Sequence, residues 1–385
     1  MELPDKIPFE NINKKIKCKW GQNTLDMLFI SAFVVGIISC GVSTSILDTS
    51  NAERLFSVLR YLIAFVAAVK IYFFSGYSIK ELIAESVLLL VLGYSGQKGG
   101  DKTLLFSAMM IFAAKDVDMK KICRYAFFAT AGVVVVLVSL AAFKIIPDSL
   151  QLRNDGLVRH SFGFAHPNAL GLWVMMAVSE FYAAYNEKLN VACYAVTAVV
   201  ALAVYKATNS RASFIVMLLL AALTPAVKYV CQKEKSLKAV KKLFVFAIAS
   251  VGILSIVLMV IFNENNKVVD IISRAVSNRI YLGNIVYKEY GLSILGDGRL
   301  IGDAQMPVVD CVYMKTSLTA GVLSLAALIY FQCRSAARSF DAKMAVLGLI
   351  CLLWAAYGTM EVFTYDVFFN VSLLAAGAAM NSKRE

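Results

Sequence analysis

Apolar stretches separated by short polar segments run through almost the whole chain. Twelve of them are bounded by charged or turn-forming residues: 24–46, 55–74, 79–95, 103–114, 124–143, 168–185, 190–205, 212–230, 243–262, 309–331, 343–358 and 362–380. About 20 apolar residues cross the core of a bilayer, and backbone polar groups in lipid must be hydrogen-bonded within their own segment. Each stretch therefore predicts a membrane-spanning helix, with 79–95 and 103–114 the weakest because they are short. The pattern indicates an all-α, polytopic integral membrane protein.

Two connecting segments, 144–167 and 263–308, are much longer than the others. Long loops in compact folds are usually functional or disordered. Within the second loop, apolar residues recur at helical spacing over 268–290, with polar residues opposite, and Gly291 is placed to end a helix. Charges within this stretch argue against a span, so we expect an external amphipathic helix that lies over the mouth of the bundle before the tenth span.

The distribution of Lys and Arg orients the predicted spans. With the N-terminus in the cytoplasm, 22 of the 38 basic residues fall in cytoplasmic segments and 13 in external ones. Cytoplasmic loops are usually the richer in Lys and Arg. We therefore expect both termini inside and the loops 144–167 and 263–308 outside, with residues 1–22 as a basic cytoplasmic tail and residues 23–385 as a single membrane domain.

Composition agrees with a membrane protein and excludes other classes. The chain has 385 residues, of which 59% are apolar and 17% charged, and its mean hydropathy is +0.69. Soluble domains are roughly 45–50% apolar and roughly 25% charged, so an ordinary soluble enzyme, a disordered chain and a disulfide scaffold are excluded. The net charge of +12 does not indicate nucleic-acid binding, because membrane proteins concentrate basic residues in loops. The eight cysteines form no CxxC pair, so they indicate neither a zinc site nor a disulfide framework.

The first long loop ends in a group of candidate phosphate ligands. Arg159 is followed by His160 and His166, which are the only histidines of the chain. Together the three side chains would form a cationic patch for phosphate. The alternative is purely local structure, in which Asn168 caps the next helix and Pro167 shapes the turn before it.

Three further arginines are placed where they would meet an external anion. Arg211 begins a predicted helix, and the dipole at a helix N-terminus favours anions and disfavours a cation such as arginine. A bound diphosphate would offset this unfavourable placement. The alternative is an ordinary helix start capped by Ser210. Arg279 lies at the edge of the apolar face of the predicted helix 268–290, where it would face either the bundle or solvent. Arg60 lies ~9 Å below the outer end of its span, where it would snorkel or reach into an external cavity.

Other positions carry weaker signals. Arg274 and Arg299 add cations to the second long loop. Glu180 would lie ~18 Å deep in its span, where it would mark an ion path or snorkel toward the inner end. No external carboxylate pair has metal-ligand spacing, so no metal site is expected.

Several stretches resemble, in the order of the family, the membrane polymerases of bacterial surface-polysaccharide repeat units and the O-antigen ligases. They are RHSFGFAHPNALG (159–171), TNSRASF (208–214), SNRIYLGNIVYKEYGLSILGDG (277–298) and VDCVYMKTSLTAG (309–321), and the last stretch MEVFTYDVFFNVSLLAA (360–376) adds Glu361 and Asn370. The resemblance covers about two-thirds of the chain. The first 150 residues contribute only hydropathy.

The resemblance implies a GT-C-like glycosyltransferase fold of membrane helices that needs no cofactor or metal. The implied donor is an oligosaccharide linked to polyprenyl (undecaprenyl) diphosphate, and the implied place is the outer face of the bacterial cytoplasmic membrane. The implied product is a capsular, exo- or O-antigen polysaccharide, and a chain-length regulator protein is an implied partner. By position, Arg211 and Arg279 would hold the diphosphate, and Arg159, His166 and Asn168 match the polymerase-type motif. Outside the resemblance, the depth of Arg60 in its span makes it a further candidate for the diphosphate, as Arg159 is. The remaining candidate substrate or structural contacts are His160, Arg299, Tyr313 and Glu361, together with Asn168.

The branch of the family and the catalytic base rest on fewer residues. Ligases have a histidine–asparagine pair where this chain has Asp310-Cys311, which favours a repeat-unit polymerase. Asp310 is a candidate base, although an aspartate at a helix start also serves as a cap. His166 is the rival base, with an ordinary pKa near ~6.5. An O-antigen ligase and, from another class, a flippase or transporter of lipid-linked oligosaccharides remain the alternative functions.

Overall fold

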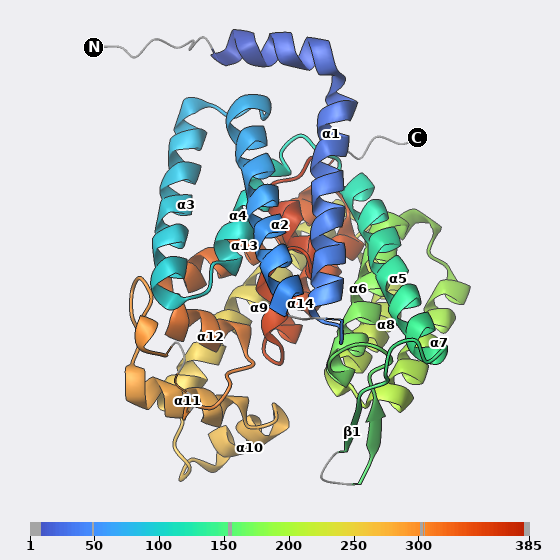
Figure 1. Cartoon of the computed structure of the whole chain (residues 1–385), viewed down its shortest axis with the longest axis vertical. Helices are drawn as coiled ribbons and strands as arrows, with labels where there is room; N and C mark the ends of the chain where they lie inside the picture. Colours follow the sequence, from blue (N-terminus) through green and yellow to red (C-terminus); the bar gives the residue numbers. More distant parts are fainter. Residues whose placement is uncertain (1–8, 48–49, 153–155, 301–302, 304, 381–385) are drawn as a thin grey trace.

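The protein is a bundle of helices with one small hairpin, seen in a computed structural model that describes residues 9–47, 50–152, 156–300, 303 and 305–380 (Figure 1). The α-helices are α1 (Phe9–Ser43), α2 (Ser50–Val69), α3 (Ile79–Gly99), α4 (Thr103–Ala113), α5 (Met119–Ala142), α6 (Pro167–Ala184), α7 (Val191–Thr208), α8 (Arg211–Val230), α9 (Glu234–Ile261), α10 (Lys267–Ala275), α11 (Arg279–Tyr290), α12 (Val312–Thr319), α13 (Val322–Asp341) and α14 (Ala345–Tyr357). Shorter turns are the π-helix η1 (Lys70–Phe74) and the 3-10 helices η2 (Asn186–Lys188), η3 (Gly298–Leu300), η4 (Val362–Tyr365) and η5 (Val371–Ala376). Strands β1 (Leu150–Leu152) and β2 (Val158–His160) pair antiparallel.

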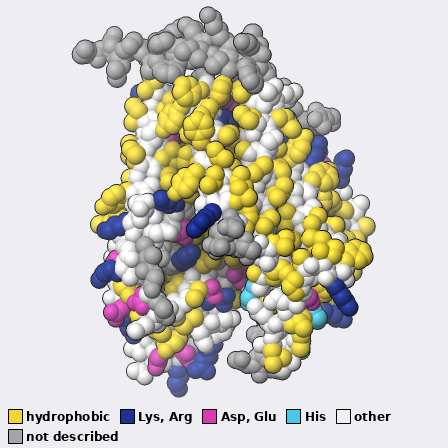
Figure 2. Space-filling model, in the orientation of Figure 1, with side chains coloured by type: hydrophobic (Ala, Val, Ile, Leu, Met, Phe, Trp, Pro, Cys, Tyr) yellow, Lys and Arg dark blue, Asp and Glu magenta, His cyan; other side chains and the backbone are white. Residues whose placement is uncertain are grey.

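Six helices in the described residues are long and apolar enough to cross a membrane. They are Asn23–Ser43, Arg54–Phe74, Met119–Ala142, Val191–Thr208, Arg211–Val230 and Glu234–Ile261, and each overlaps a predicted span. Apolar side chains also cover much of the surface around the middle of the bundle (Figure 2). Both observations fit a membrane-embedded protein, as the hydropathy predicts. A total of twelve spans remains a prediction.

Both long loops lie at one end of the bundle. The β1–β2 hairpin and helices α10 and α11 occupy the lower end of Figure 1, which we call the loop end. At the opposite end, Ala379 forms a parallel bridge with Asp118, just before α5. Charged side chains gather toward the loop end, below the apolar middle (Figure 2). The loops in which the sequence places its candidate residues therefore share one end.

The amphipathic helix predicted over 268–290 is two helices, so the expectation of a single one is wrong. Ser277 and Asn278 have left-handed backbones, with φ of 57° and 60°, and they separate α10 from α11. The hydroxyl of Ser273 accepts the backbone N–H of Tyr281 at 3.1 Å, which satisfies a donor at the start of α11. Gly291, with φ of 71°, ends α11 as predicted.

The stretches 309–331 and 362–380 also differ from the continuous α-helices expected of them. The first is broken between α12 and α13 at Gly321, whose φ is +90° and whose added Cβ would lie 2.4 Å from the backbone nitrogen of Gly296. The second contains only the 3-10 turns η4 and η5. Arg334 and Arg338 of α13 donate to the carbonyls of Ala376, Ala375 and Ala378. Irregular backbone is tolerated at membrane depth when it is buried in protein, and here two guanidinium groups supply the missing donors.

Glu180 lies inside the bundle and does not snorkel. Its side chain is on α6, which packs along α5, and the residue is only 1% exposed. Its Oε2 atom has no hydrogen-bond partner among the described residues. The ion-path alternative stays a prediction.

Candidate functional site

At the loop end, three side chains from distant segments form a chain of hydrogen bonds. Arg159 of β2 donates through Nε to the carbonyl oxygen of Thr208 at 2.6 Å and through Nη2 to Oδ1 of Asn168 at 2.5 Å. This orients the Asn168 amide, whose Nδ2 donates to Oε1 of Glu361 at 3.3 Å. Asn168 and Glu361 are 193 residues apart in the sequence. The chain therefore links the first long loop, the α7–α8 connection and the segment after α14.

Arg279 and Asp310 form the other half of this cluster. Arg279 Nη2 lies 3.6 Å from Asp310 Oδ2, and the arginine side chain is 12% exposed whereas the aspartate side chain is 45% exposed. The Nε atom of Arg279 is buried without a hydrogen-bond partner among the described residues. An unmet buried donor is costly, so this guanidinium retains capacity for another acceptor. Arg279 faces the bundle, as one of the two sequence alternatives has it.

Glu361 lies between two predicted spans and is surrounded by charges of both signs. Burial raises the pKa of its carboxyl to about 7, and the negative charge of Asp310 adds to this. The cations Arg279 and Arg159, and the Asn168 amide, oppose the rise. Its Oε2 atom makes no hydrogen bond to the part of the chain that the structure describes, whereas Oε1 is held by Asn168. The carboxyl is thus fixed in place with one oxygen free.

His166, rather than Asn168, caps α6. Its Nδ1 accepts the backbone N–H of Asn168 at 3.0 Å, and Pro167 is the first residue of the helix. The expectation that Asn168 is the cap is wrong, because its amide is engaged by Arg159 and Glu361 instead. Burial lowers the pKa of His166, and Arg159 lowers it further. A neutral imidazole that accepts at Nδ1 carries its proton on Nε2. The Nε2–H of His166 is therefore a hydrogen-bond donor that the helix cap does not use.

Several predicted residues lie outside the cluster. His160 pairs with Asp148, Nδ1 to Oδ2 at 2.6 Å, and braces the hairpin. Arg299 pairs with Asp297 on the surface, and Arg274 pairs with Asp270 one turn earlier in α10. Tyr313 is fully buried and donates to the carbonyl of Ala355 at 2.8 Å, which is a core contact.

Arg211 is exposed as the first residue of α8, and no ion pair joins it to another described residue. Ser210 occupies the cap position before it but makes no capping hydrogen bond; its hydroxyl donates to Ser213 at 3.3 Å. The free N-terminus of α8 and the unpaired guanidinium are therefore both available to an anion. Arg159 connects this helix start to the cluster through Thr208, three residues before Arg211.

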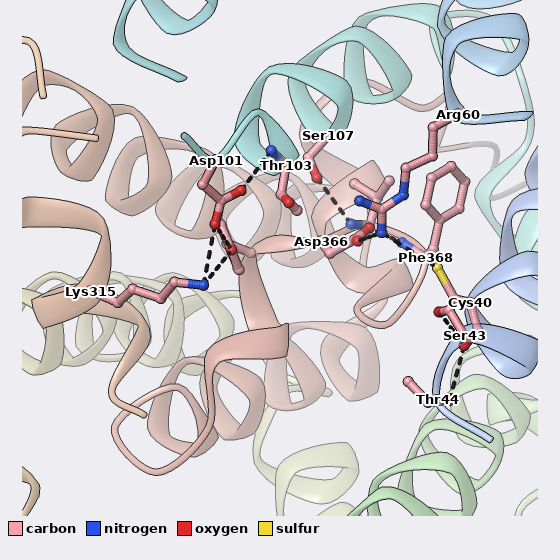
Figure 3. Close-up of polar contacts among 12 residues, drawn as sticks. Cys40, Ser43, Thr44, Arg60, Asp101, Thr103, Ser107, Lys315, Asp366 and Phe368 are labelled. Carbon is pink, nitrogen blue, oxygen red and sulfur yellow. Dashed lines mark hydrogen bonds and ion pairs between the residues drawn. The ribbon is translucent and has the colours of Figure 1, made fainter. Parts of the chain in front are cut away.

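Arg60 lines a cavity instead of snorkelling. The cavity has a volume of about 400 Å³ and is also lined by His166, Lys315 and Asp366. Arg60 Nη2 lies 3.2 Å from Asp366 Oδ2, and Lys315 Nζ lies 3.2 Å from Asp101 Oδ2 (Figure 3). Arg60 thus belongs to a polar group that is separate from the Arg279 cluster. His166 lines the cavity of the first group and also neighbours Arg159 and Asp310 of the second.

The sequence argument passed over Asp366, Lys315 and Asp101. The signal was present for the first two, because ionisable residues inside apolar stretches are rare and usually functional. Their partners were not readable from the sequence. Arg60 and Asp366 are 306 positions apart.

No protein family, no curated protein and no solved structure matches this chain.

Proposed function

We propose that the protein is a polymerase of polysaccharide repeat units, which joins polyprenyl-diphosphate-linked oligosaccharides on the outer face of the bacterial cytoplasmic membrane. One observation carries the proposal: all five stretches that resemble the family meet at one site. The first stretch supplies Arg159 and Asn168. The other four supply one residue each: Thr208, Arg279, Asp310 and Glu361. A membrane bundle with a cationic site at one end suits a donor whose lipid tail stays in the bilayer.

The reaction needs a cation for the leaving group and a base for the attacking hydroxyl. The hydroxyl oxygen of one lipid-linked repeat unit bonds to the anomeric carbon of another, and the bond from that carbon to the diphosphate oxygen breaks. The electron pair leaves with the diphosphate, whose charge Arg279 and Arg211 offset electrostatically. The hydroxyl proton passes to a general base. The balance requires no redox partner or nucleotide.

Glu361 fits the role of base better than Asp310 or His166. Asp310 is paired with Arg279, so we assign it to holding that guanidinium. His166 uses Nδ1 as the helix cap, so its Nε2–H is placed to donate to a substrate oxygen. Glu361 offers a free Oε2 atom, and a pKa of about 7 matches the value at which a base is efficient near neutral pH.

Reconstitution tests the proposal directly. The full chain in proteoliposomes is given lipid-linked repeat units, and products are separated on a gel. We expect a ladder of polymers from the wild-type protein and from the control Arg274→Ala, whose side chain is exposed and pairs only within α10. Arg279→Ala should remove the ladder at an equal protein level. A ladder of normal intensity from Arg279→Ala would overturn the proposal, and a single transferred product on a lipid acceptor would indicate the ligase instead.

A second candidate, a transporter of lipid-linked oligosaccharides, is favoured by the interrupted spans. Transporters often carry discontinuous helices near their binding sites, and here α12–α13 and η4–η5 are both interrupted. A cavity of about 420 Å³, lined by Glu81, Lys115 and Arg334 among others, lies toward the end opposite the hairpin. Movement of a fluorescent lipid-linked oligosaccharide across proteoliposomes without polymer formation would establish this function in place of the first.

A further inference from the structure

The cavity beside Arg60 is lined by aromatic and hydroxyl-bearing side chains, in contrast to the charged side chains of the Arg279 cluster. Its volume of about 400 Å³ falls within the range of small-molecule sites, ~300–1,000 Å³. Three aromatic side chains of the segment after α14, Phe363, Tyr365 and Phe369, line it together with the hydroxyl-bearing Ser43, Thr44 and Thr103.

The cations of this cavity already have carboxylate partners. Asp366 pairs with Arg60 and also accepts the backbone N–H of Phe368 at 3.0 Å through Oδ1. Lys315 pairs with Asp101, and its Nζ also donates to the hydroxyl of Tyr365 at 3.3 Å. Figure 3 shows the two ion pairs side by side, Asp101 with Lys315 and Asp366 with Arg60.

An anion bound to these cations would either lie against the carboxylates or displace them, whereas a neutral ligand would do neither. Removing one partner of a buried ion pair leaves an uncompensated charge, which is strongly unfavourable. Arg279 is also paired, with Asp310 at 3.6 Å, but its buried Nε has no partner among the described residues. Arg211 has no ion pair with another described residue, so these two cations keep donors for an anion. The two groups of cations are therefore suited to different ligands.

Both guanidinium and carboxylate groups keep capacity for a neutral polyhydroxylated ligand. A guanidinium has five N–H donors and a carboxylate about four acceptor positions. Arg60 contacts Asp366 and the Cys40 sulfur through Nη2, and Asp366 also accepts from Phe368, so both groups keep unused positions. Arg60 is 33% exposed, which leaves its donors accessible from the cavity. Paired donors and acceptors at one wall match the vicinal hydroxyls of a sugar, and aromatic rings offer flat apolar surfaces to the C–H faces of a pyranose.

We propose that this cavity is a sugar subsite, which binds a neutral pyranose ring of the acceptor glycan through Arg60 and Asp366 against the aromatic wall. The assignment rests on the proposed function for its acceptor role. With this assignment Arg60 binds sugar and is no longer one of the arginines that the sequence assigns to the diphosphate. His166 lines the cavity and also neighbours Arg159 and Asp310, so a ring bound here lies next to the site that carries Glu361.

Binding of simple glycosides tests the subsite without any lipid-linked substrate. The full chain in lipid nanodiscs is mixed with the methyl pyranosides of glucose, galactose, mannose and N-acetylglucosamine, and saturation-transfer NMR detects which ones bind. We expect at least one to bind and inorganic pyrophosphate at equal concentration not to displace it. Asp366→Asn and Phe363→Ala should each weaken this binding about tenfold, as expected for one or two lost contacts. The control Arg274→Ala should bind normally.

Binding of none of the four glycosides, or their displacement by pyrophosphate, would overturn the subsite. Because Asp366→Asn removes a buried charge and risks misfolding, Phe363→Ala provides the second variant, and retained glycoside binding by folded protein in both would also overturn it.

A kinetic measurement separates this inference from the proposed function. A repeat unit without a diphosphate can serve only as acceptor, so it is offered beside the lipid-linked donor. In this assay Phe363→Ala should raise the KM for the acceptor about tenfold and leave the KM for the donor unchanged. Glycoside binding without any polymer would remove the polymerase and keep the subsite. Polymer formation with an unchanged acceptor KM would keep the polymerase and remove the subsite.

Discussion

Glu361→Gln should abolish activity and at the same time stabilise the protein at alkaline pH. Glutamine keeps the shape of the side chain and still accepts from Asn168 through its carbonyl oxygen. It cannot accept a proton from a substrate hydroxyl. The groups that act on the charge of Glu361 are Arg279 of α11, Asp310 before α12, Asn168 of α6 and Arg159 of β2.

The expected magnitude follows from the pKa. Burial raises it from the usual 4.5 to about 7, and this difference corresponds to at most ~3 kcal/mol in the free energy of unfolding. Because the pKa is higher in the folded state, the stability that it contributes is complete below pH 4.5 and is lost as the pH rises through about 7. Glutamine has no charge to bury, so the variant should gain stability over the wild type at pH 8 and show none of this gain at pH 4.

The assay combines thermal unfolding in detergent at pH 4 and pH 8 with polymer formation across pH 5.5–9. Wild-type activity should rise with pH, with a midpoint near 7, since only the carboxylate accepts a proton. Loss of a general base typically costs ~10²–10⁴-fold. Asp310→Asn should shift the midpoint to lower pH, because it removes the negative charge that helps to raise the pKa of Glu361. Wild-type rates from Glu361→Gln, or an unchanged midpoint in Asp310→Asn, would refute the assignment of the base.

Four other predictions address separate parts of the molecule. A cysteine at position 266 should react with an impermeant thiol reagent from outside whole cells and one at 236 should not; the reverse pattern would invert the topology. Arg211→Ala should lose most polymerisation, because it removes a cation that offsets the charge of the leaving diphosphate, and Arg211→Lys should rescue it poorly because lysine lacks the bidentate fork. Activity should survive EDTA, so a sharp requirement for magnesium or manganese would reveal an overlooked site. Gly377→Ala should lower the unfolding temperature, since its Cβ would lie 1.8 Å from the carbonyl oxygen of Ile111, whereas Gly132→Ala, with nothing within 4 Å, should not.

Hydropathy determined where the long helices lie, because a segment in lipid must satisfy its own backbone. Asn23–Ser43 and the apolar part of Glu234–Ile261 needed no tertiary information, since a long apolar run is sufficient for a spanning helix. The second helix begins nine residues before the predicted 243, in the lysine-rich segment. Gly291 was also readable, because a glycine after a periodic apolar run ends a helix by local geometry. The short motifs marked Arg159, Arg279, Asp310 and Glu361 individually.

Tertiary structure decided what periodicity within one segment does not encode. The 362–380 stretch has the composition of a span, yet η4 and η5 are 3-10 turns because neighbours bury the segment and Arg338 reaches its carbonyls. The choice of Asp366 as the partner of Arg60, and of Asn168 as the partner of Glu361, depends on how segments hundreds of residues apart pack together. Hydrophobic pattern reports whether a residue faces lipid or protein, but only packing determines which polar group stands opposite it.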